Sequence, residues 1–386
     1  MGKYAKLTRA RNDGMKNKVK KFIDSTKKYV PAATWIFVAV AALSFVALVI
    51  MKKSVAVADA LNATTGRAIR FVLTNIFNIF PFSFTETLVL LSPVLLALVI
   101  ILCVRAGKRG IDKLTRTVCV FLCVTIAVFS SFVFGYEASY YGSGIEKNVG
   151  FERRDVSVDE LKQTALILLD RVKAELDEIG YLESGSSVMP YRFSEMSDKL
   201  NDAYEKFCEK YPAYQSMYSR LKPVILSEPW TYTHISGLYS FFTGEANINV
   251  NYPDFIVVST AAHEMSHQRG MGKEDECDFA SFLVCTMSDD PYIRYSGYLE
   301  NYRLVVDKLY GADKGAWFEV RSQEDGRIAK ELSAFSKFFD KYRENVAAKV
   351  NDAVNNAYIQ SHNQPAGVKS YGLVVDLIVN YIINGD

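Results

Sequence analysis

The sequence predicts a mainly α-helical membrane protein with a small β element, and three observations carry the prediction. Three long apolar segments without charged residues lie within the first 136 of the 386 residues. Helical periodicity recurs through the rest of the chain, and segments rich in β-branched and aromatic residues interrupt it only between residues 222 and 251. The next predicted helix contains His263-Glu264-Met265-Ser266-His267, an HExxH motif.

The three apolar segments have the lengths of transmembrane helices. They cover residues 29–51, 87–104 and 117–136, which is 23, 18 and 20 residues, and a helix needs about 20 to cross a bilayer. A cleaved signal peptide is the alternative for the first segment, but its apolar core and its basic leader are both too long for a typical one. Residues 71–85 are apolar but number only 15, so they predict an interfacial or re-entrant segment.

Basic residues predict the orientation in the membrane. The N-terminus, residues 1–28, holds ten Lys or Arg against two Asp, and residues 105–116 hold five basic residues against one acidic residue. Both segments are therefore expected in the cytoplasm. Three spans then place residues 137–386 outside the cytoplasm, as the extracytoplasmic domain of a multi-pass protein whose first partner is the lipid bilayer.

The charge of the predicted outer domain excludes one class of partner. Of 45 basic and 43 acidic residues, 19 and 5 precede residue 137, which leaves 26 and 38 for residues 137–386. This net negative charge provides no basic surface for nucleic acid. Only Cys208, Cys277 and Cys285 lie in this domain, so no disulfide framework is implied.

The HExxH motif holds two of the four histidines in the chain. Residues four apart share one face of a helix, so His263 and His267 can bind one zinc ion. Glu264 can then take the proton of a water molecule that the ion activates, which is the chemistry of peptide hydrolysis. The alternative is that this short pattern arose by chance on an ordinary surface helix.

A third ligand is expected shortly after the motif. Gly270 and Gly272 permit a sharp turn, after which the acidic segment 274–278 begins another helix. Because Glu274 and Asp278 are four residues apart, Asp278 could hold a ligand histidine by its second ring nitrogen if Glu274 binds zinc. Glu274 is thus the predicted third ligand and Glu276 the reserve. The alternative is a solvated first turn that the helix dipole favours.

Known zinc peptidases resemble this arrangement to different degrees. The pattern Glu-x-x-Cys-Asp resembles the third-ligand helix of penicillin-sensing receptor peptidases, and Glu-x-x-Ala-Asp is that of prenyl-protein proteases, both gluzincins. Gly270 also fits the metzincin motif, but the metzincin third ligand would fall on Lys273, a poor ligand. Cys277 is expected to be a small buried residue, because a thiolate would close the position that catalysis keeps open.

Segments around the motif complete the predicted domain. Residues 222–228 and 237–251 look like strands, with a turn at Thr243-Gly244, and predict either a structural hairpin or an edge that receives the substrate. Tyr298 is a candidate donor to the oxyanion, although a stripe of tyrosines is more often part of a core. Helices are expected over residues 156–179, 194–209, 290–309, 329–359 and 371–383, the first opened by a Ser157-x-x-Glu160 capping box.

Four blocks of the sequence together resemble a known family. They are SGLYSFFTGEANINVN, TAAHEMSHQRGMGKEDECDFASFLVC, IRYSGYLENY and GVKSYGLVVDLI. They are similar to the bacterial membrane proteins grouped as domain of unknown function 3810, except that Cys277-Asp278 stands where that family more often has Ala-Asn. The resemblance implies a zinc metallopeptidase in which His263, His267 and a carboxylate between Glu274 and Glu276 bind the ion and Glu264 is the base.

The sequence therefore predicts three transmembrane helices followed by a zincin-like (HExxH) metallopeptidase domain. We expect Zn²⁺ as the cofactor and a peptide or protein of unknown identity as the substrate. Two alternatives stay open, namely a non-catalytic membrane sensor or scaffold that zinc stabilises, and a zinc amidase that acts on cell-wall peptides.

Overall fold

The computed structural model describes residues 29–343 and 345–384, so the basic N-terminus lies outside the described residues. Within them the chain is mostly helical with few strands, as predicted. The chain divides into two compact units. One holds the chain up to Val49 together with Leu88–Val133, and the other holds Ile50–Thr87 together with Phe134–Asp386.

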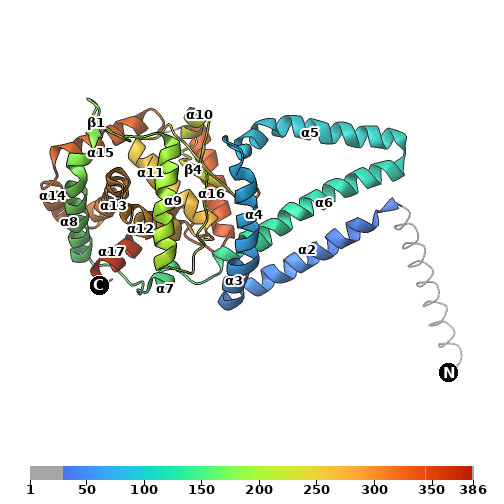
Figure 1. Ribbon diagram of the computed structural model, residues 1–386, viewed down its shortest axis with the longest axis horizontal. Helices are drawn as coiled ribbons and strands as arrows, with labels where there is room; N and C mark the ends of the chain where they lie inside the picture. The colour runs from blue at the N-terminus through green and yellow to red at the C-terminus, as the bar shows by residue number, and fades with distance from the viewer. Residues whose placement is uncertain (1–28, 344, 385–386) are drawn as a thin grey trace, which may run out of the picture. The chain divides into compact units, whose positions relative to one another are not determined.

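Most of the first unit consists of three apolar helices, each long and apolar enough to cross a membrane. These are α2 (Ala32–Met51), α5 (Phe84–Arg109) and α6 (Ile111–Gly135) (Figure 1). A hydrogen bond of 2.9 Å between the hydroxyls of Ser44 and Ser130 joins α2 to α6. The apolar stretch of α5 is not buried at all, which suits a helix surrounded by lipid.

Residues 50–87 belong to the second unit, which hydropathy alone did not reveal. They form α3 (Val55–Leu61), the π-helix η1 (Asn62–Gly66) and α4 (Arg67–Asn78), so much of the segment predicted to be interfacial is the end of α4. The carboxylate of Glu245 accepts hydrogen bonds from the backbone amides of Phe84 (3.0 Å) and Thr85 (2.8 Å). This contact fixes the start of α5 to the second unit.

The predicted helices of the larger domain are present. The capping box of Ser157 and Glu160 opens α8, and the pair α15 and α16 fills the predicted region 329–359. The helices are α7 (Ile145–Val149), α8 (Val158–Glu175), α9 (Phe193–Lys210), α10 (Ser227–Thr231), α11 (Asp254–Gln268), α12 (Glu274–Thr286), α13 (Pro291–Ala312), α14 (Lys314–Arg321), α15 (Gly326–Asp340), α16 (Val346–Ser361) and α17 (Val374–Asn384), with the 3₁₀ turns η2 (Glu137–Tyr140), η3 (Leu176–Glu178) and η4 (Gly367–Leu373).

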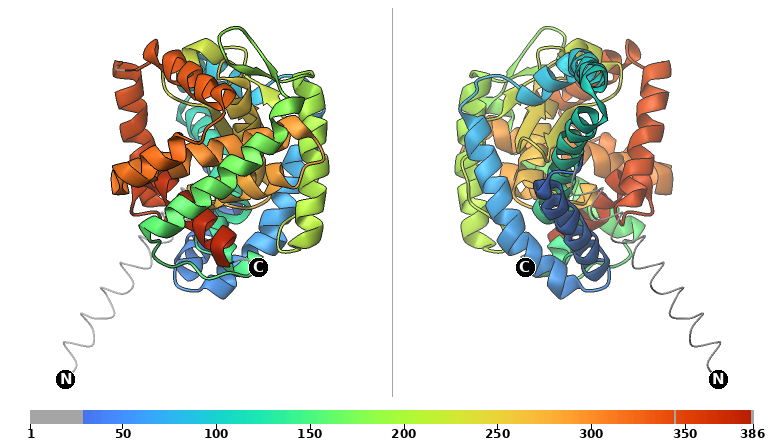
Figure 2. Two further views of the ribbon diagram at one scale, coloured as in Figure 1. Left: turned by 90° about the vertical axis from the view of Figure 1, so that its left-hand side faces the viewer. Right: turned by 90° about the vertical axis from the view of Figure 1, so that its right-hand side faces the viewer.

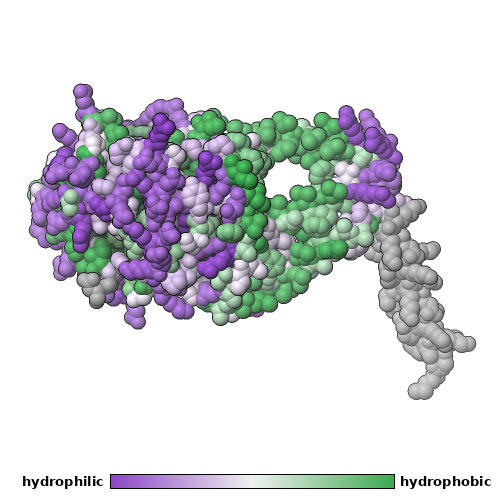
Figure 3. All heavy atoms as spheres, in the orientation of Figure 1, coloured by the Kyte–Doolittle hydropathy of each residue, from purple (hydrophilic) through white to green (hydrophobic). Residues whose placement is uncertain are grey.

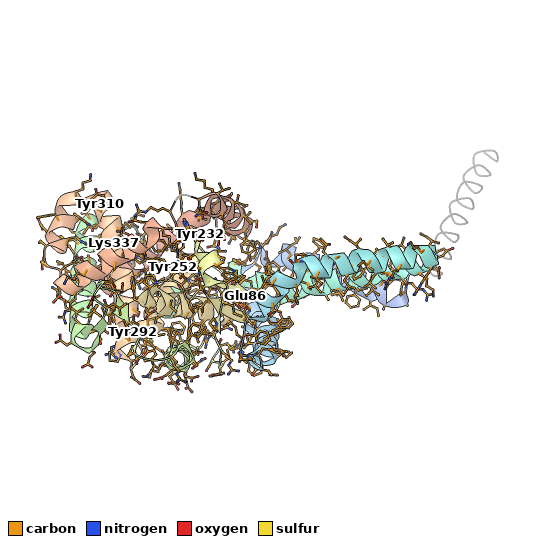
Figure 4. All side chains as sticks on the ribbon, turned by 90° about the horizontal axis from the view of Figure 1, so that it is seen from above. Glu86, Tyr232, Tyr252, Tyr292, Tyr310 and Lys337 are labelled. Atoms are coloured by element: carbon orange, nitrogen blue, oxygen red, sulfur yellow. The ribbon has the colours of Figure 1, made fainter. Side chains whose placement is uncertain are left out.

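The core of the second unit surrounds α11. Helices α12 and α13 pack against α11 and against each other, α9 packs on α12, and α8 packs on α13 (Figures 1 and 2). Phe255, Ala261 and Met265 of α11 are fully buried, as is Tyr292 of α13, which is labelled in Figure 4. Burying one large apolar side chain contributes about 1.5–3 kcal/mol, so α11 is held firmly in place.

A small sheet lies against α11. Its order is β3 (Lys222–Pro223), β5 (Glu245–Ile248) and β4 (Gly237–Ser240), with β5 parallel to β3 and antiparallel to β4. The predicted strand 222–228 is wrong beyond Pro223, because α10 begins at Ser227. A separate hairpin pairs β1 (Gly180–Tyr181) with β2 (Ser187–Val188). In the described part of the chain β4 is therefore an edge strand.

Candidate metal centre

The HExxH motif occupies the C-terminal end of α11. His263, Glu264 and His267 are all buried, and the two imidazole rings lie 4.9 Å apart between their centroids. The spacing of four residues places both rings on one face of the helix. On another side of α11 the hydroxyl of Tyr204 lies 2.7 Å from that of Ser266, which ties the motif to α9.

A tight turn after α11 brings the acidic residues back to the motif. Gly270 has a φ of +94°, a left-handed conformation that glycine adopts without strain, and the amide of Met271 bonds back to the carbonyl of Ser266. The side-chain amide of Asn62 donates to the carbonyl of Gly270 over 2.8 Å. Helix α12 then begins at Glu274, a few residues after His267.

Three donor atoms face one another at this point. The Nε2 atom of His263 lies 3.2 Å from Oε2 of Glu274, and the Nε2 atom of His267 lies 3.7 Å from the same oxygen. Two imidazole nitrogens and one carboxylate are a ligand set that zinc accepts in catalytic sites, with a fourth position left for water. The carboxylate of Glu276 instead pairs with the ammonium group of Lys273 at 2.7 Å.

The second nitrogen of each imidazole ring is also held. Nδ1 of His263 lies 2.6 Å from Oδ1 of Asp278. Nδ1 of His267 lies 2.9 Å from the carbonyl oxygen of Met271 and 2.7 Å from the hydroxyl of Tyr136. Acceptors at Nδ1 fix the tautomer in which Nε2 carries the lone pair, which a metal ion requires.

Cys277 offers a second ligand set. Single ligand atoms of His263, His267 and Cys277 all lie within 4.8 Å of one another. However, the thiol of Cys277 lies 3.2 Å from Nδ1 of His267, whereas Glu274 faces Nε2 of both rings. Burial raises the pKa of the Cys277 thiol well above its ordinary value. Glu274 is therefore the better third ligand.

The carboxylates of the centre differ in their protonation. Burial opposes the ionisation of Glu274. Without a metal ion, the interactions of its carboxylate with protonated His263 and His267 outweigh burial and hold the pKa of Glu274 below its usual range. Burial raises the pKa of Glu264, against the attraction of the two histidines. Burial also raises the pKa of Glu276 to about 7. The carboxylate of Glu274 is thus ionised, and Glu264 is a stronger proton acceptor than an exposed glutamate.

Glu264 lies directly against the edge strand β4. The backbone of Tyr239 hydrogen-bonds to its carboxylate. A Cβ atom at Gly237 would lie 2.5 Å from Oε1 of Glu264, so only glycine permits this close approach. Leu238, between these two residues, is 42% exposed. A peptide added along the free edge of β4 would therefore pass beside Glu264.

Tyrosine hydroxyls near the centre come from residues that the sequence did not indicate. The hydroxyls of Tyr140 and Tyr358 lie 3.0 Å apart, and burial, aided by the charges of Glu137 and Glu274, raises the pKa of Tyr358 to about 12. Tyr298, the predicted oxyanion donor, instead has Arg171, Glu175 and Arg294 as its charged neighbours, on the side of α13 that packs against α8.

The two histidines outside the motif, His234 and His362, interact with other parts of the chain. Nε2 of His234 lies 2.9 Å from the carbonyl oxygen of Tyr342, and Nε2 of His362 lies 3.2 Å from the carboxylate of Glu137. Gly237 and Tyr239 could have been suspected only from their place in a strand before the motif. No sequence signal links Tyr136 to His267, because 131 residues separate them.

Comparison with known proteins identifies the family and no activity. No curated protein and no solved structure matches the chain. One family model matches residues 64–379, which include α4, the sheet, the HExxH helix and part of α17. Because this match covers most of the sequence, the chain belongs to the family described as protein of unknown function (DUF3810).

Proposed function

We propose that this protein is a membrane-anchored, gluzincin-like zinc metallopeptidase. The observation that carries the proposal is the convergence of Nε2 of His263 and Nε2 of His267 on one carboxylate oxygen of Glu274. The acidic Glu264 lies beside this donor set and against an edge strand. The proposed ligands, the proposed base and the edge strand β4 all belong to one unit of the chain, which supports the proposal.

The chain's own residues divide the work of hydrolysis. A bound zinc ion would polarise the peptide carbonyl and make a water molecule acidic enough to ionise near pH 7. Glu264 takes the proton of the attacking water and then gives it to the leaving amine. Asp278 and the carbonyl of Met271 keep the two imidazoles oriented. Tyr358 is the proposed hydrogen-bond donor to the oxyanion, in place of Tyr298.

The substrate would bind as an added strand along β4. In the described part of the chain no strand pairs with the outer edge of β4, and main-chain hydrogen bonds between this edge and a peptide would hold the peptide beside the metal centre. The carboxylate of Glu264, which contacts this strand from the side of α11, would then face the bond to be cleaved.

We place the metal centre outside the cytoplasm. Three spans put residues 52–83 and the chain after Gly135 on the same side of the membrane. The inclusion of both segments in one compact unit supports that topology. The basic residues of segments 1–28 and 105–116 favour the cytoplasm for the opposite side.

A single substitution tests the proposed mechanism. Glu264→Gln should bind zinc as the wild type does, because its ligands are unchanged, but should no longer cleave peptides. The membrane and secreted proteins of cells that carry either form should differ in fragments that only the wild type produces. Equal fragment patterns, with zinc bound in both forms, would favour the alternative of a membrane sensor or scaffold that zinc stabilises.

A further inference from the structure

Most polar side chains of helix α4 face the protein and most of its large apolar side chains face away, together with the exposed Asn75, whose amide bonds to the carbonyl of Phe71. Arg70 and Thr74 are buried, and Thr74 donates to the carbonyl of Gly244 over 3.0 Å. Asn78 donates to the carbonyl of Tyr218 over 3.0 Å. The opposite face exposes Phe71, Val72, Ile76 and Ile79, the last of them 73% exposed. Exposure of such an apolar face to water is unfavourable.

The exposed apolar surface extends beyond α4. Phe82, in the connection to α5, is exposed, and so is Ile225, whose backbone amide bonds over 2.9 Å to the carboxylate of Glu86 (labelled in Figure 4). Hydrophobic residues form a continuous area over α4 in Figure 3. We call this surface the apolar patch, which consists of Phe71, Val72, Ile76, Ile79, Phe82 and Ile225. Between residues 71 and 85 the sequence has no charged residue.

The connection of the apolar patch to two membrane-type helices indicates what covers it. Residues 52–83 connect α2 to α5, two helices that are long and apolar enough to cross a membrane, so both ends of this segment emerge at one membrane surface. Lys52 and Lys53, at the end of α2, are exposed and can extend toward lipid headgroups. A helix with one apolar face, held at both ends to the membrane, fits the boundary between headgroups and acyl chains.

The apolar patch is also connected to the edge strand. The carbonyl oxygen of Gly244 accepts hydrogen bonds from Thr74 of α4 and, over 2.7 Å, from the side chain of Gln268 at the end of α11. From Leu238 to Gly244 the chain is six residues long, which spans at most about 20 Å. A peptide bound along β4 would therefore lie close to the lipid surface.

We propose that the apolar patch rests in the lipid surface and that the metal centre acts on peptide segments held near that surface. The second part rests on the proposed peptidase function. Substrates of this class are membrane-anchored peptides and the membrane-proximal segments of membrane proteins. The lipid surface itself, and not a second copy of the chain, is the occupant of the patch.

Fluorescence tests the lipid contact without any substrate. The full chain with Ile76→Trp is placed in phospholipid vesicles with and without brominated acyl chains. The fluorescence of the three native tryptophans is measured on the unaltered chain in the same vesicles and subtracted. Bromine should quench the added tryptophan strongly. The matched control is Leu182→Trp, a similarly exposed site next to β1, at the other end of the same unit (Figure 1), which should not be quenched.

Two results would overturn the lipid contact. One is equal quenching, or none, at the two positions. The other is a change in the fluorescence of the Ile76→Trp variant that follows the density of the protein in the vesicle and not the bromine, because a second copy would then cover the patch.

Peptide cleavage tests the substrate class. A pool of internally quenched peptides is offered either free or joined to a lipid anchor by a short spacer. In the double variant Ile76→Asn, Ile79→Asn, cleavage of the anchored pool should fall about tenfold, while cleavage of the free pool should be unchanged. An equal effect on both pools would refute the substrate class alone. No Glu264-dependent cleavage of either pool would refute the proposed function, whereas the fluorescence would still decide on the lipid contact.

Discussion

Gly237→Ala should reduce hydrolysis while leaving the zinc ion in place. The added Cβ atom would lie 2.5 Å from Oε1 and 2.7 Å from Cγ of Glu264, and 2.7 Å from Cγ2 of Thr260. Ordinary contact begins at 3.4 Å, so the carboxylate must move by about 0.9 Å. A displacement of about 1 Å in a catalytic group costs about 10²-fold in rate. The three atoms nearest to the added Cβ belong to Glu264 and Thr260, and not to any of the three proposed zinc ligands.

The assay compares kcat on a pool of quenched peptides with the zinc content of the same preparations. We expect kcat to fall by about 10²-fold and zinc to stay at the wild-type level. Gly311→Ala is the control, because a Cβ atom there meets nothing within 4 Å. A Gly237→Ala protein with wild-type kcat would refute the proposal that Glu264 is the base. A loss of zinc would refute the proposal that Glu264 can move without disturbing the zinc ligands.

Three further substitutions test single contacts. Asp278→Asn should weaken zinc binding by about 10- to 100-fold, because it removes the carboxylate that orients His263, and competition with a chelator measures this. Glu276→Gln should keep zinc and flatten the dependence of stability on pH. Burial raises the pKa of Glu276 from 4.5 in the unfolded chain to about 7, so its contribution to the free energy of unfolding is most favourable below pH 4.5. About 3 kcal/mol of that contribution is lost as the pH rises from 4.5 through 7. If Glu276→Gln left the dependence of Tm on pH unchanged, the burial of this carboxylate would be contradicted. Tyr358→Phe should lower kcat by about 10²-fold and Tyr298→Phe should not, and the reverse result would restore Tyr298 as the oxyanion donor.

Local sequence signals predicted most helices because the interactions that start and stabilise a helix lie within a few residues of one another. The capping box at Ser157 and Glu160 and the apolar periodicity of α8 depend on residues within one helix. The same holds for the metal residues, because His263 and His267 share a helix and the turn at Gly270 returns Glu274 within a few residues. Short-range geometry was therefore enough to predict that His263, His267 and Glu274 lie together, while their role as zinc ligands stays a prediction.

Residues that meet through the tertiary fold could not be predicted in this way. Tyr136 ends an apolar segment that hydropathy assigns to the membrane, yet its hydroxyl contacts His267 in the second unit. Gly237 looks like an ordinary strand glycine until Glu264 is placed beside it. Residues 71–85 are apolar enough to suggest a membrane surface, but the inward hydrogen bond of Thr74 depends on Gly244, 170 residues later.

The atoms that surround the zinc ion distinguish a catalytic centre from a closed structural one. X-ray absorption at the zinc edge of the purified full chain measures which atoms surround the ion. We expect nitrogen and oxygen scatterers at about 2.0–2.2 Å, from His263, His267, Glu274 and water. A sulfur scatterer at about 2.3 Å would mean that Cys277 closes the site, and would contradict a catalytic zinc centre.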